Sequence, residues 1–240
     1  MFGEWVDRLG ELHDEYDGGC PFRHVVIEDF FDTMSPVPDP DSSWIHYDNP
    51  IEQKYILDTC GHLPMIMAMQ SNEFVHKIET ITGIRNLRTD PDLRAAGVHA
   101  HTRGGKLDIH LDYSFHQKLG MERRCNLIVY MSDWNEDWGG DLQLWNADMS
   151  AYKSISPKLN TAVLFECTDT SFHGVPTPIM CPEGVYRKSL AVYYLSEPRP
   201  DMIKRYRAEF FPYSGKVIDD RMRRLYDIRK TRNLIKDDLV

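Results

Sequence analysis

Apolar and polar residues alternate in KLDIHLDYSF, residues 106–115, and this period of two predicts a β-strand with two different faces. His110 and Asp112 fall on the same face of that strand. Three further apolar runs follow, separated by turn signals: RRCNLIVYMS, GGDLQLWNAD and TAVLFECTDT. The run RKSLAVYYLS completes the series. We therefore expect residues 97–197 to form a β-rich core.

The segments on either side of this core show mixed patterns. Residues 1–20 predict a short amphipathic helix that carries Trp5 and ends at Gly18-Gly19. Residues 21–96 predict a strand at HVVIED, a loop through the Pro-rich stretch 35–50, and two helical segments near 51–59 and 64–80. Residues 198–240 begin with PRP and then become charged and helical. The first and last segments are expected to flank the core with helices.

Size and hydropathy are typical of one soluble domain. The chain has 240 residues and a mass of 28.0 kDa, so residues 1–240 are expected to form a single domain. A hydrophobic content of 42% can build a core, and the mean hydropathy of −0.47 indicates a soluble protein. No apolar run approaches the roughly 18 residues of a membrane span, and the acidic N-terminal stretch lacks a signal pattern. We expect a cytoplasmic protein with no membrane partner.

Cysteine usage agrees with a reducing compartment. The five cysteines are odd in number and scattered, and none belongs to a C-x-x-C pair: Cys20, Cys60, Cys125, Cys167 and Cys181. This arrangement indicates neither a disulfide framework nor a zinc site.

The C-terminal tail differs from the rest of the chain in charge. Residues 201–240 hold 11 Lys and Arg against 7 Asp and Glu, whereas the whole chain has a net charge of −9. A basic patch could bind nucleic acid or an acidic partner. However, Ile218, Met222 and Leu225 give the predicted helix an apolar stripe. We therefore favour a helix docked on the core or on a second copy, as in a homodimer, over nucleic-acid binding.

Two His-x-Asp motifs are candidates for metal binding. The sequence His46-Tyr47-Asp48 lies in PVPDPDSSWIHYDNP, which is rich in Pro, Asp and Ser and indicates a loop. The sequence His110-Leu111-Asp112 lies in the alternating strand, which aims both side chains at the same side. We favour the second motif as the metal site.

A distal histidine and an arginine extend this motif. His173 lies in TSFHGVPTPI after the strand-like runs, and two imidazoles with one carboxylate form the arrangement that non-haem Fe(II) uses to activate dioxygen. Arg187 and Ser189 share one face of the next strand, and a guanidinium can hold a carboxylate through two parallel bonds. Lys188, on the opposite face, is the alternative cation. Together these residues suggest a 2-oxoglutarate-dependent oxygenase.

Four stretches resemble the prolyl 4-hydroxylase-like branch of the Fe(II)/2-oxoglutarate oxygenases: PFRHVVIEDFF, GVHAHTRGGKLDIHLDYSFH, RRCNLIVYMSDWNEDWGGDLQLW and SFHGVPTPIMCPEGVYRKSLAVYYLS. The resemblance covers about residues 21–197. It implies a double-stranded β-helix, or jelly roll, of the mainly β (α+β) class.

The resemblance also implies the roles of the site residues. His110, Asp112 and His173 would bind Fe(II), and Arg187 with Ser189 would bind the far carboxylate of 2-oxoglutarate. Tyr130 and Asn126 match positions that touch this cosubstrate in relatives, whereas His99 and His101 stand where relatives carry a tyrosine. The implied reaction is dioxygen-dependent hydroxylation of an amino acid, a prolyl residue or another small metabolite. It releases succinate and CO2, with ascorbate as a candidate reductant.

Two alternatives remain open at this stage. One is a non-catalytic jelly-roll module that only binds a partner. The other is a metal-dependent jelly-roll enzyme that does not use an oxo acid. Formation of succinate from 2-oxoglutarate, with Fe(II) and air supplied, distinguishes the three.

Overall fold

A computed structural model describes residues 1–239. Its longer strands are β1 (His24–Ile27), β3 (Glu52–Leu57), β5 (Gly97–His101), β6 (Lys106–Leu111), β8 (Met121–Tyr130), β9 (Leu142–Trp145), β10 (Tyr152–Ile155), β11 (Ala162–Glu166), β12 (Phe172–Val175) and β13 (Arg187–Ser196). Shorter strands are β2 (Ile45–Asp48), β4 (Arg88–Thr89), β7 (Phe115–His116) and β14 (Glu209–Phe210).

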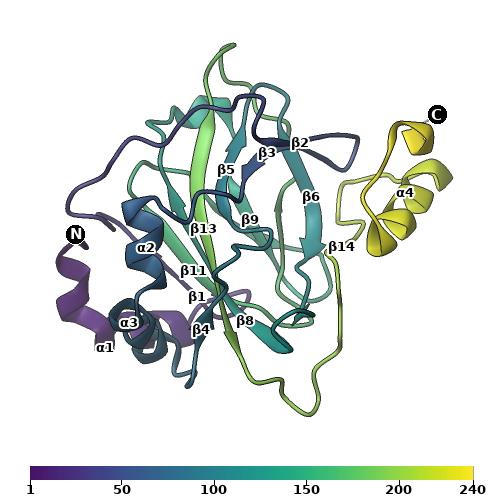
Figure 1. The fold of residues 1–240 in the computed structure, drawn as a ribbon. Coiled ribbons are helices and arrows are strands. Elements are labelled where there is room, and N and C mark those ends of the chain that lie inside the picture. The colour runs from purple at the N-terminus through teal and green to yellow at the C-terminus, as the bar shows by residue number, and fades with distance from the viewer. Residues whose placement is uncertain (240) are drawn as a thin grey trace.

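These strands form one antiparallel sheet that curls into a half-barrel (Figure 1). Hydrogen-bonded neighbours follow the order β1-β11-β8-β13-β5-β3-β6-β12-β9-β10. Strands β2, β4, β7 and β14 are added at β3, β13, β8 and β6. The architecture is a jelly-roll core with flanking helices, and the predicted fold class is confirmed.

Helices lie on two sides of the sheet (Figure 1). They are the 3₁₀ turns η1 (Glu4–Arg8), η2 (Glu136–Trp138) and η3 (Lys236–Leu239) and the α-helices α1 (Leu9–Asp17), α2 (Pro64–Gln70), α3 (Asn72–Thr82) and α4 (Asp220–Thr231). A helix was predicted over residues 1–20, but the structure divides this segment into η1, which carries Trp5, and α1, which ends at Asp17 with Gly18 as its C-cap. The helix predicted near 64–80 is divided at Ser71, whose extended backbone ends α2 and whose hydroxyl accepts from the Phe74 amide to cap α3.

Two predictions for the segment before the core were wrong. Residues near 51–59 form strand β3 and not a helix, and the expected loop 35–50 contains strand β2. The two strands pair with each other, and β3 also bridges β5 and β6. These long-range ladders override the local pattern, because strand formation depends on the neighbours available in the folded sheet.

Strand β13 separates the hydrophobic core from the interior of the half-barrel. Its even-numbered residues Leu190, Val192 and Tyr194 join the cluster that packs against α1, α2 and α3. Its odd-numbered residues, beginning with Arg187 and Ser189, line a cavity inside the sheet. The same alternation holds in β5, where Val98 and Ala100 enter the core, while the two histidines between and after them line the cavity. The pleat thus directs polar side chains inward at the site.

The C-terminal tail packs on its own chain. Leu225 and Tyr226 of α4 are buried with Ile51 and with Phe210 of β14. The expected apolar stripe is used in this contact, since Ile218 and Met222 pack against the same cluster. The tail also reaches the strand of the His-x-Asp motif: the Tyr226 hydroxyl donates to Asp108 Oδ2 at 2.9 Å, and Lys216 pairs with the same carboxylate. Docking on the core is therefore the alternative that the structure favours.

Candidate active site

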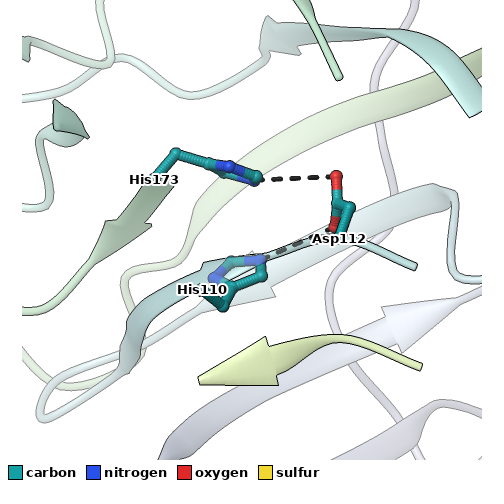
Figure 2. A group of neighbouring side chains, drawn as sticks. All are labelled: His110, Asp112 and His173. Carbon is teal, nitrogen blue, oxygen red and sulfur yellow. Dashed lines mark ion pairs between the residues drawn. The ribbon is translucent and has the colours of Figure 1, made fainter. Parts of the chain in front are cut away.

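His110, Asp112 and His173 come together inside the half-barrel (Figure 2). One ligand atom from each lies within 4.8 Å of the others, and no other group of three His, Cys, Asp or Glu side chains is this close among residues 1–239. His110 Nε2 is 3.6 Å from Asp112 Oδ1, and His173 Nε2 is 3.7 Å from Asp112 Oδ2. Such a group can hold a divalent cation on one side and leave the other side open.

The two histidines are opposite one another because β6 and β12 pair in the register that aligns them. His110 and His173 are paired residues of these antiparallel strands, and the register shifts directly after them. A Cβ on Gly174 would lie 2.7 Å from the carbonyl oxygen of Leu107 and 2.9 Å from that of Asp108. Only glycine permits this approach.

Both imidazoles are oriented by the same kind of hydrogen bond. His110 Nδ1 donates to the Asp108 carbonyl and His173 Nδ1 to the Ser171 carbonyl, each at 2.9 Å. A carbonyl can only accept, so the proton is on Nδ1 and the lone pair on Nε2 faces the carboxylate. Burial, with His110 and Arg123 nearby, lowers the pKa of His173 to about 4. His173 is therefore neutral at pH 7 and able to bind a metal.

Arg123 holds the carboxylate of the triad. Its Nη1 lies 2.9 Å from Asp112 Oδ2, and its guanidinium carbon is 3.5 Å from the ring centroid of Tyr113 and 3.4 Å from that of Tyr193. Asn126 Nδ2 donates to the same oxygen at 3.3 Å. Burial alone would raise the pKa of Asp112, but the Arg123 guanidinium holds it well below its usual range. The carboxylate is therefore ionised and fixed in direction.

The cosubstrate candidates lie in or beside the cavity that the triad lines. Arg187 is buried, and its guanidinium carbon is 4.9 Å from the ring centroid of Tyr130. Ser189 and Asn126 line the same cavity. Lys188 lies on the other strand face, as expected, where its Nζ donates to the Val37 carbonyl at 2.8 Å and pairs with Asp39. The structure thus brings together every residue that the sequence proposed for the metal and the cosubstrate.

Unpartnered polar atoms test whether this end of the cavity fits a dicarboxylate. Arg187 Nε, the Tyr130 hydroxyl and both ring nitrogens of His101 are buried without a hydrogen-bond partner among residues 1–239. Such groups are costly to bury unless a ligand or water satisfies them. The donors suit the carboxylate of 2-oxoglutarate, and the His-Asp-His set suits Fe(II), so the residues present fit both groups.

The first His-x-Asp motif does not take part in this site. His46 and Asp48 lie in β2 and are exposed, and the His46 ring stacks on Tyr55 with 4.3 Å between centroids. The segment is a strand and not the expected loop, but neither residue belongs to the three-ligand group. Preferring the second motif agrees with the geometry.

Sequence reasoning missed several residues around the cavity, which has a volume of about 300 Å³. Lys54, Arg94, Arg207 and Arg229 line it, and Arg123 lies behind its wall. Arg123 left a signal, because a charged residue follows an acidic one at the start of an otherwise apolar strand. The other four cations had no recognisable sequence signal, because they come from three segments that lie far apart in the chain.

Comparison with known proteins gives the site its context. Residues 96–195 match the model of the 2OG-Fe(II) oxygenase superfamily. This segment belongs to that superfamily. It contains all five of the residues proposed for the metal and the far carboxylate of the cosubstrate. The superfamily uses iron and 2-oxoglutarate, so the predicted enzyme class and cofactors are confirmed.

Solved structures of prolyl hydroxylases are similar to this oxygenase. One is a prolyl hydroxylase from Trichoplax adhaerens in complex with a hypoxia inducible factor oxygen degradation domain peptide fragment; the TM-score is 0.57 at 16% identity, covering 81% of this chain and 94% of that one. Another is a Pseudomonas putida prolyl-4-hydroxylase, with a TM-score of 0.49 at 15% identity over 76% and 97% of the two chains. The first shows a shared fold. No curated protein sequence matches the chain.

The helices of the oxygenase are too short or too polar to span a bilayer throughout residues 1–239.

Proposed function

We propose that this oxygenase hydroxylates a C–H bond of a small molecule or a short peptide segment, with His110, Asp112 and His173 holding Fe(II). The observation that carries the proposal is the His-Asp-His group lining the same cavity as the buried Arg187, whose Nε has no hydrogen-bond partner among residues 1–239. Arg187 would bind the far carboxylate of 2-oxoglutarate through its planar fork, with Ser189 beside it. Tyr130 and Asn126 would complete the contacts.

The bound Fe(II) and 2-oxoglutarate would supply the oxidising chemistry, with dioxygen as oxidant and succinate and CO2 as products. The protein positions these groups and keeps water away. The Asp108 and Ser171 carbonyls fix the two imidazoles, and Arg123 fixes Asp112. Tyr193 lines the cavity and covers Arg123, which shields the ion pair from solvent.

The cavity volume supports a modest substrate. About 300 Å³ is at the lower end of the range for small-molecule sites, which also favours a single side chain of a peptide. An amino acid, a prolyl residue or another small metabolite fits this description. Ascorbate as reductant, a homodimer through the tail and a cytoplasmic location stay predictions. Light scattering tests the homodimer. The cytoplasmic location is supported by the cysteines, all five of which are free thiols.

Succinate formation tests the function directly. The purified protein, given Fe(II), air and 2-oxoglutarate, should form succinate even without its substrate, at a slow uncoupled rate. A binding module, or a jelly-roll enzyme that does not use an oxo acid, would form none. Omitting Fe(II) provides the baseline.

Substitution of the ligands tests the assignment of the triad. His110→Ala, Asp112→Ala and His173→Ala should each abolish succinate formation and weaken Mn(II) binding measured by calorimetry. The matched controls His46→Ala and Asp48→Ala should leave both unchanged, because these side chains are exposed on β2. Loss of metal in His46→Ala with retention in His110→Ala would show that the wrong motif was chosen.

A further inference from the structure

Outside the triad and the cosubstrate residues, more positive than negative side chains line the cavity, although the chain as a whole has a net charge of −9, and the mouth of the cavity is its partly exposed end at Arg94 and Arg207. Beyond the groups proposed to meet iron and 2-oxoglutarate, four cations line the cavity: Lys54, Arg94, Arg207 and Arg229. The carboxylates that line it there are Glu52 and Asp58. Positive side chains therefore outnumber negative ones in the space left for a substrate.

Glu52 is already neutralised from two sides. Arg229 Nε donates to its Oε1 at 2.7 Å, and Lys54 Nζ lies 3.5 Å from its Oε2. Burial would raise the pKa of Glu52, but these two cations hold it below the ordinary value. Its direct partners are thus Arg229 and Lys54, and neither Arg94 nor Arg207 pairs with it.

Arg94 and Arg207 meet at the mouth without a carboxylate. Neither forms an ion pair within the described chain, residues 1–239. Arg94 Nη2 donates to the Tyr206 carbonyl at 3.2 Å, which places it beside Arg207. Arg207 Nε donates to the Arg229 carbonyl at 3.4 Å, and its Nη2 bonds Asn233. Neutral oxygens thus hold the two guanidinium groups in place and leave their charges uncompensated.

Like charges repel, so an acidic protein that orders two arginines here gains from an anion between them. A planar guanidinium binds carboxylate and phosphate oxygens through parallel bonds, and two such groups suit an anion with several oxygens. We propose that the substrate carries a carboxylate or phosphate group, bound by Arg94 and Arg207 at the mouth while its reactive carbon faces the triad. This inference rests on the proposed function for the position of iron and 2-oxoglutarate.

Anion binding is testable without knowing the substrate. Inorganic phosphate and acetate are each titrated by calorimetry into the protein saturated with Mn(II) and 2-oxoglutarate, which keeps Arg187 occupied. Broadening of the ³¹P or ¹³C signal by Mn(II) then reports whether the anion lies near the metal. The anion that binds more tightly identifies the acidic group. We expect saturable binding with broadening for at least one of the two.

Matched variants assign the binding to the mouth. Arg94→Gln and Arg207→Gln should each weaken binding about tenfold or more, while Arg94→Lys and Arg207→Lys should recover part of it. The control Arg223→Gln changes an exposed arginine of α4 that pairs with Asp220 and does not line the cavity. It should bind as the unsubstituted protein does.

Two results would overturn the inference: neither anion binds the unsubstituted protein, or both Gln variants bind as tightly as Arg223→Gln does. Failure of the proposed function looks different, since Mn(II) and 2-oxoglutarate themselves would then not bind. In that case the same titrations on the metal-free protein still decide whether Arg94 and Arg207 form an anion site.

Discussion

Replacing Arg123 with Met should destabilise the metal-free protein strongly. The Arg123 side chain is 0% exposed and its Nη1 lies 2.9 Å from Asp112 Oδ2, so the two groups form a buried ion pair. Met fills much of the same volume between Tyr113 and Tyr193 but carries no charge. The carboxylate would then lie among two neutral imidazoles and Asn126, without a cation.

The structure sets the size of this effect. Removing one partner of a buried ion pair costs about 3–5 kcal/mol, because the other charge remains uncompensated. Domains unfold with free energies of about 5–15 kcal/mol, so the Met variant should be marginally stable. Arg123→Lys keeps the charge and loses the flat stacking on two rings, which should cost about 1–2 kcal/mol.

Urea unfolding of the metal-free protein measures the effect, and a double-mutant cycle isolates its cause. Arg123→Met is compared with Asp112→Asn and with the double variant. The neutral amide does not need a cation, so the double variant should be more stable than the sum of the single losses predicts, by about 2 kcal/mol. Additive losses would refute the ion-pair reasoning.

Metal addition gives an independent check of the same reasoning. A bound Mn(II) supplies the positive charge that Arg123→Met removes. The ion should therefore raise the unfolding midpoint of this variant by more than it raises that of the unsubstituted protein. Equal stabilisation would show that Asp112 does not contact the metal.

Three further outcomes follow from the geometry. Arg187→Ala should raise the KM for 2-oxoglutarate about ten- to hundred-fold at nearly unchanged Fe(II) affinity, whereas Lys188→Ala, which acts outside the cavity, should change it little; the opposite ranking would reverse the strand faces. Gly140→Ala should weaken 2-oxoglutarate binding in calorimetry and spare Mn(II) binding, because Gly140 has φ +85° and an added Cβ would lie 3.0 Å from Arg187 Cδ; normal affinity would contradict this. Burial, with Lys54 nearby, lowers the pKa of His99 from 6.5 to about 3. Between these two pH values the His99 side chain is protonated in the unfolded chain and neutral in the folded protein. The stability of the metal-free protein should fall by up to about 1.4 kcal/mol per pH unit between these two values as the pH decreases, and a His99→Gln variant with the same slope in urea unfolding would argue against it.

The core and its ligands could be predicted because strand periodicity acts locally. Alternation in β6 and β13 was enough to place Asp112 beside His110, and Ser189 beside Arg187. His173 needed only its order in the chain and the resemblance. This pattern can be read from a single sequence, because side chains alternate between the two faces of a strand every two residues.

Strand β3 and the two arginines at the mouth of the cavity show why the other parts of the fold and the site could not be predicted from the sequence. Residues 52–57 became a strand because β5 and β6 offered edges on either side. Arg94 and Arg207 are 113 positions apart and meet only when the tail docks on β6. No local pattern reports a contact over that distance.

Because the tail docks on the core, the two ends of the cavity are built from different segments of the chain and can change independently during evolution. The residues proposed to bind iron and cosubstrate lie within 96–195, whereas Arg207, Arg229 and Asn233, which also line the cavity, belong to the tail. A lineage can exchange or remodel this tail and acquire a new substrate while its oxidising centre stays intact. A substrate assignment should therefore be transferred from a relative to this chain only when the relative's sequence also aligns with residues 206–233.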